Sequence, residues 1–146
     1  MSAISGKKPE YALGVIFGTG IGGAFANEKL KMKNEKINNE IIFRGRDGWA
    51  GEFGHMIIDK GKTWEKLYQE TKNKPKEQEK INAIGLANLI NIFNPEVIIL
   101  GGKGAKKPNK ELIEKYLLLL KKQMPKFIMA KLKDNSVAIG ATMLWN

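Results

Sequence analysis

The chain of 146 residues contains no cysteine, a single histidine, His55, and no arginine other than Arg44 and Arg46. The absence of cysteine excludes disulfides and removes the thiolate ligands on which most structural zinc sites depend. A domain of this length buries roughly 68–70% of its unfolded surface, so it does not need such cross-links. We therefore expect one domain with an ordinary hydrophobic core, working in a reducing compartment.

Long apolar runs are also missing. The longest ones, Val97 to Leu100 and Leu117 to Leu120, are far shorter than the roughly 20 residues of a membrane-spanning helix. The first nine residues lack the apolar core of a signal peptide. These absences predict a cytoplasmic protein with no membrane partner.

The net charge of +10 comes almost entirely from lysine. Readout of bases favours bidentate arginine and a basic stripe with aromatic side chains for stacking, and this sequence has neither. We therefore expect no nucleic-acid partner. A lysine-rich surface instead attracts small anions such as ATP, or simply keeps the protein dispersed.

The hydrophobic pattern predicts an α/β domain. The continuous apolar run over 11–17 indicates a buried strand, and 24–26 a strand that returns in a hairpin. Further strands are predicted over 41–43, 56–58, 97–100 and 127–132, and helices over 64–71, 78–93, 111–122 and 136–145. Thr63 and Asn109 are predicted helix caps, and Pro75 and Pro95 are predicted breaks. Strands followed by strand–helix units favour a mixed sheet, with a polar loop over 30–40.

Glycines gather directly after the first strand, at Gly18, Gly20, Gly22 and Gly23, around Thr19. Glycine lets the backbone approach a ligand closely, so such a loop can aim N–H groups at phosphate oxygens. The spacing also fits the dinucleotide fingerprint, but that motif requires a helix after the glycines, and here a strand follows. A tight hairpin without a ligand is the alternative interpretation.

A second glycine-rich segment, residues 48–55, contains Glu52 and His55. A carboxylate beside a neutral imidazole suits a polyol, because both groups make directional hydrogen bonds to hydroxyls. A lone histidine in such a turn can also be structural. A third segment, residues 94–102, is a short apolar strand that ends at Gly101 and Gly102.

The order of these segments, together with Asp134 to Thr142 near the end, resembles the ROK family of sugar kinases and repressors. The resemblance covers about residue 11 to the C-terminus. It implies a ribonuclease H-like lobe of the actin-like ATPase type, with a mixed sheet and flanking helices. It also implies glucokinase-like transfer of a phosphoryl group from ATP, bound with Mg²⁺, to a hexose.

The resemblance assigns roles to individual residues. The loop of Gly18, Thr19, Gly20, Gly22 and Gly23 corresponds to the loop that holds the β- and γ-phosphates. Gly101 and Gly102 match the motif beside the nucleoside, although an ordinary left-handed turn is the alternative there. Glu52, His55 and Glu65 match the sugar ligands, although Glu65 could equally be a favourable negative charge in the first turn of a helix.

Two departures from the family stand out. The cysteine loop that holds zinc in most relatives is missing here, so we expect no zinc site. The N-terminal domain of the kinases, with its first phosphate loop and catalytic aspartate, has no counterpart before Tyr11. Asp47, Asp59 and Asp134 do not stand in the family's catalytic context.

Residues 1–146 are therefore interpreted as a single domain, the C-terminal nucleotide-binding lobe, and no catalytic residue is assigned. We expect catalysis to need a separate N-terminal lobe, and homodimerisation to cover apolar surface. The alternative is a non-catalytic sugar- or nucleotide-binding module. A repressor is less favoured, because no helix-turn-helix precedes the lobe.

Overall fold

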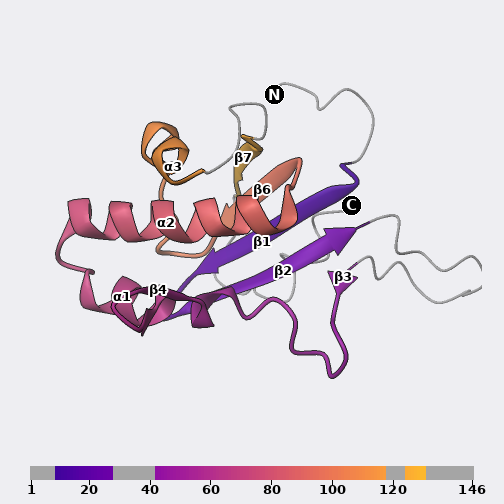
Figure 1. The fold of residues 1–146 in the computed structure, drawn as a ribbon, viewed down its shortest axis with the longest axis horizontal. Helices are drawn as coiled ribbons and strands as arrows, with labels where there is room; N and C mark the ends of the chain where they lie inside the picture. The colour runs from indigo at the N-terminus through magenta and orange to yellow at the C-terminus, as the bar shows by residue number, and fades with distance from the viewer. Residues whose placement is uncertain (1–8, 28–41, 118–123, 131–146) are drawn as a thin grey trace, which may run out of the picture.

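The computed structural model describes residues 9–27, 42–117 and 124–130 (Figure 1). The loop predicted over 30–40 and the closing helix predicted over 136–145 lie outside these ranges. Within them, no helix has the length and apolar character needed to cross a membrane.

The described part is built on a five-stranded sheet with the strand order β3-β2-β1-β6-β7. Antiparallel pairs join β1 to β2 and β2 to β3, whereas β6 lies parallel to both β1 and β7. The predicted mixed sheet is therefore confirmed. Its strands are β1 (Tyr11–Phe17), β2 (Ile21–Asn27), β3 (Ile42–Phe43), β6 (Val97–Gly101) and β7 (Lys126–Met129).

Between β3 and β6 the chain forms a 3-10 turn, a small hairpin and two helices. These are η2 (Phe53–His55), β4 (Ile57–Asp59), β5 (Lys62–Thr63), α1 (Trp64–Glu70) and α2 (Pro75–Phe93). Helix α3 (Lys110–Tyr116) follows β6 and packs on α2. Figure 1 shows α2 as the longest helix, with α1 and β4 grouped near its N-terminal end.

The predicted caps are confirmed. The Thr63 hydroxyl accepts a hydrogen bond from the Lys66 amide at 3.2 Å, and the Asn109 side chain accepts one from the Leu112 amide at 3.0 Å. Helix α2 ends at Phe93, and its C-cap residue Asn94 adopts a left-handed conformation with φ 44°. Each cap satisfies a backbone group that the helix itself leaves unpaired.

Three predicted boundaries are wrong. Helix α2 begins at Pro75 and not at Gln78, because the fixed φ of proline suits the first helical position and its missing N–H is not needed there. The segment before Pro75 does separate α1, which ends at Glu70, from α2. Helix α3 ends at Tyr116, since Leu117 is extended with ψ 119°. Strand β7 ends at Met129, where its pairing with β6 ends.

Trp64 joins the helices to the sheet. Its side chain is fully buried, its indole N–H donates to Asn82 Oδ1 at 3.0 Å, and its ring meets Phe17 edge-on with centroids 5.8 Å apart. A Cβ on Gly85 of α2 would overlap the indole ring. Glycine at position 85 therefore lets α2 approach α1 closely enough to close the core.

We predict that Gly85→Ala destabilises the protein, although alanine favours helix more than glycine does. The added methyl must displace the indole, and overpacking of this kind costs about 1–3 kcal/mol. Gly22→Ala is the matched control, because a Cβ there meets nothing within 4 Å. Chemical denaturation of the two variants measures the difference, and equal midpoints would contradict the proposed packing.

Candidate functional site

The glycine loop is the turn that joins β1 to β2. The Gly18 amide donates to the Gly20 carbonyl at 2.9 Å, which closes the turn, and Gly18 and Thr19 are exposed. The chain then enters β2 directly, with Ile21 opposite Phe17. No helix begins at these glycines, so the geometry of the dinucleotide fingerprint is absent from this loop.

Gly101 and Gly102 lie beside this loop. Parallel pairing places Gly101 opposite Ile16, so β1 and β6 end at the same edge of the sheet. Gly102 has φ 88°, and a Cβ there would overlap the carbonyl of Phe17. Gly102 is therefore required by its own backbone and by close approach to β1, whether or not a ligand binds.

The turn that holds Glu52 and His55 also packs against the glycine loop. A Cβ on Gly54 would overlap the carbonyl of Ile21, and the ring of Phe53 fills the position of a side chain at Gly23. The His55 Nε2 and Glu52 Oε2 atoms are 3.7 Å apart, with 68% and 56% of their side chains exposed. The predicted polar pair thus lies together and open to solvent.

Glu65 lies between the turn and the loop. Its Oε2 accepts the Ile21 amide at 2.9 Å and lies 3.1 Å from the position of a Cβ on Gly54. A Cβ on Gly20 would overlap the same carboxylate. The structure therefore brings Glu65 near Glu52 and His55, and gives it a contact that the sequence did not indicate.

Two of the loop's glycines thus have structural reasons to be glycine, Gly20 against Glu65 and Gly23 against Phe53. By contrast, a Cβ on Gly18 or Gly22 would meet nothing within 4 Å. The open side of the loop therefore lies at Gly18, Thr19 and Gly22. The sequence shows only a run of glycines and does not separate these two groups.

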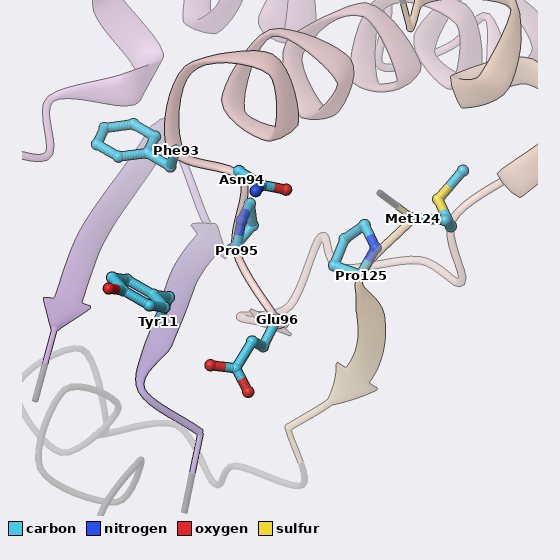
Figure 2. Close-up of a pocket in the computed structure, with 7 residues that line it drawn as sticks. All are labelled: Tyr11, Phe93, Asn94, Pro95, Glu96, Met124 and Pro125. Atoms are coloured by element: carbon cyan, nitrogen blue, oxygen red, sulfur yellow. The ribbon is translucent and has the colours of Figure 1, made fainter. Parts of the chain in front are cut away.

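A cavity of about 530 Å³ lies elsewhere in the described part of the chain (Figure 2). Figure 2 shows its lining from the start of β1 at Tyr11, the turn after α2 at Asn94 and Pro95, and Glu96 before β6. It lies where the parallel strands begin. Ligands of open α/β sheets bind where parallel strands end, so we place the candidate site at the glycine edge.

The zinc arrangement of the family does not fit this chain. His55 has the Glu52 carboxylate near it, and the sequence offers no cysteine. Within residues 9–27, 42–117 and 124–130, no group of three or more histidine, aspartate or glutamate side chains could hold a metal ion. A structural zinc needs about four such ligands.

The sequence pattern of the ROK family matches residues 62–146. The chain belongs to the ROK family. No curated protein matches it in sequence.

Solved structures show the same fold. A ROK glucokinase from Streptomyces griseus, in complex with glucose and AMPPNP, aligns over 96% of this chain with TM-score 0.66 and 19% identity. A ROK hexokinase from Thermus thermophilus aligns over 93% with TM-score 0.62 and 21% identity. A ROK transcriptional regulator, a homologue of the E. coli MLC protein, aligns over 92% with TM-score 0.59 and 16% identity.

The match is partial on the side of these relatives. The alignments cover 62% of the Streptomyces chain, 57% of the Thermus chain and 45% of the regulator. The ROK family thus includes sugar kinases and transcriptional regulators that share this α/β arrangement.

We predict that Gly20→Ala releases the Ile21 amide. The methyl displaces the Glu65 carboxylate, and loss of a hydrogen bond to a charged group costs about 1.5–3 kcal/mol. Hydrogen exchange at Ile21, followed by NMR, should become faster in this variant. Gly18→Ala is the control, because it adds the same methyl in open space, and equal exchange in both variants would refute the packing role of Gly20.

Proposed function

We propose that this chain is the nucleotide-binding C-terminal lobe of a ROK-type sugar kinase, with the ribonuclease H-like arrangement of actin-like ATPases. The reaction is phosphoryl transfer from ATP, with Mg²⁺, to a hexose hydroxyl. One observation carries the proposal: the glycine loop, Gly101–Gly102 and the Glu52–His55 turn meet at one edge of the sheet, where β1 and β6 end.

The glycine loop would hold the phosphates. Gly18, Thr19 and Gly22 are exposed, and open space beside the two glycines leaves room for oxygen atoms. Gly20 and Gly23 would maintain the conformation of the loop through their close packing against Glu65 and Phe53. Gly102 is exposed at the end of β6, where the nucleoside would lie against backbone without a side chain in the way.

Glu52, His55 and Glu65 would bind the sugar. Their carboxylate and imidazole groups can pair with several hydroxyls, and they lie beside the loop that would hold the transferable phosphate. Phosphoryl transfer depends mainly on such positioning and on charge neutralisation. The Streptomyces relative with glucose and AMPPNP supports these two ligand classes.

Catalysis would require a second lobe. We place the protein in the cytoplasm and expect this chain to hold no zinc. The solved kinases are longer than this chain, and the family's catalytic aspartate has no match in its sequence. Apolar side chains such as Trp49, 75% exposed, and Ile57, 60% exposed, offer surface to a partner lobe or a second copy.

A non-catalytic sugar-binding module is the second candidate. Likeness to the transcriptional regulator favours it, because that protein shares the fold. The same turn with Glu52 and His55 would then bind a sugar without phosphate transfer.

We predict that the chain alone binds ADP with a dissociation constant in the millimolar range, about 4 kcal/mol, because the resemblance assigns the first phosphate loop to the N-terminal lobe. Gly18→Val should prevent ADP binding without unfolding the protein, because the valine side chain would occupy the open space in which we place the phosphate. NMR titration measures both. The exposed Asn91→Ala on α2 serves as control, and equal ADP shifts in all three proteins would exclude this loop.

We also predict that the chain alone phosphorylates glucose at or near background, and that an added N-terminal ROK lobe restores turnover. A missing general base alone removes roughly 10²–10⁴-fold. A coupled assay with ATP and Mg²⁺ measures the rate. Glu52→Ala should abolish the restored activity, whereas the exposed Glu114→Ala on α3 should keep it. Robust turnover without the partner would overturn the requirement for a second lobe.

A further inference from the structure

One face of α1 holds the backbone of the glycine loop. Tyr68 and Gln69 lie three and four positions after Glu65, so each of their side chains lies on the same side of the helix as that of Glu65. Glu65 Oε2 accepts the Ile21 amide at 2.9 Å, the Tyr68 hydroxyl donates to the Gly18 carbonyl at 3.4 Å, and Gln69 Nε2 donates to the Thr19 carbonyl at 3.0 Å. Each contact bridges more than forty residues of sequence.

The helix itself is firmly anchored. The Tyr68 side chain is 3% exposed, and its ring lies 5.7 Å from that of Phe17. The buried Gln78 donates from Nε2 to the Tyr68 carbonyl at 3.0 Å, which ties α1 to α2. Burial raises the pKa of Tyr68, so its hydroxyl keeps its proton and remains a donor at neutral pH.

These contacts fix the direction of the loop's amides. The described residues contain no cis peptide bond, and in a trans peptide the carbonyl and the following N–H point in opposite directions. The carbonyls of Gly18 and Thr19 point to α1. The N–H groups of Thr19 and Gly20 must therefore point away from it.

The peptide between Gly20 and Ile21 has the reverse orientation. Its N–H points to Glu65, and its carbonyl accepts the Gly18 amide. Glu65 thus holds the Ile21 amide, whereas the two successive amides of Thr19 and Gly20 point away from α1. Successive backbone N–H groups on one side of a loop can form an anion site.

We propose that Glu65, Tyr68 and Gln69 are positioning residues. They hold the glycine loop in the conformation in which the Thr19 and Gly20 amides face the bound phosphate. The proposal rests on the proposed nucleotide site and adds the element that shapes it. Tyr68 and Gln69 contact the carbonyl side of the loop and act on phosphate through the backbone. Glu65 also lies against Gly54. The same face of α1 therefore sets the distance between the glycine loop and the turn that holds Glu52 and His55.

The test uses the full chain labelled with ¹⁵N and inorganic pyrophosphate as the probe. In the unsubstituted chain the Thr19 and Gly20 amide resonances should shift on titration. Tyr68→Phe, which keeps the buried ring, and Gln69→Ala should each weaken pyrophosphate binding about 3–10-fold, the equivalent of one hydrogen bond. Asn91→Ala removes an exposed helical amide from α2 and should bind as the unsubstituted chain does.

Relaxation of the amides in the absence of ligand separates positioning from general stability. In Tyr68→Phe and Gln69→Ala the order parameters of residues 18–20 should fall, while the core strands keep theirs. If pyrophosphate binds but both variants match Asn91→Ala in affinity and loop order, the positioning role is overturned and the phosphate site stands. If pyrophosphate shifts no amide of the unsubstituted chain, the phosphate site is wrong and the positioning role falls with it.

Discussion

The parallel pairing of β1 with β6 is the constraint on which the rest of this structure depends. It brings the loop after Phe17 beside Gly101 and Gly102, across some eighty residues of sequence, because parallel strands end at the same edge. A shift of one residue in this register would turn the buried side chains of Leu13 and Val15 to the other face, so core packing maintains it. The packing of the core therefore determines the geometry of the candidate site.

Close packing explains more of the glycine pattern than ligand binding does. Gly20 lies against Glu65, Gly23 against Phe53, Gly54 against Ile21 and Gly85 against Trp64, so each lets two elements approach where a methyl would not fit. Gly18 and Gly22 face open space instead. A motif that looks uniform in sequence thus divides into residues that shape the loop and residues that leave room beside it.

Local signals in the sequence predicted most of the described elements, because they depend on neighbouring residues. The apolar run of β1, the caps at Thr63 and Asn109 and the stop at Asn94 are of this kind. The turn η2 and the strand β5 were missed. Strand β5 is only two residues long and pairs with the neighbouring β4, whereas η2 packs on β2, which is distant in sequence. The contact of Glu65 with Ile21 was missed for the same reason: it joins positions 44 residues apart, and no periodic pattern reports such a pairing.

The exposure of Glu52 and His55, the proposed sugar ligands, bears on why the proposed lobe would need a partner. Water competes for hydrogen bonds to Glu52 and His55, more than half of whose side chains are exposed, and it screens the charge of the Glu52 carboxylate. A second surface that closes over them would remove that water and strengthen each contact without changing any residue of the turn. Glu65 differs from them, because it is half-buried and already holds the loop. The proposed site thus has a preformed side at α1 and a solvent-exposed side at η2, and specificity for a sugar would arise when the exposed side is covered.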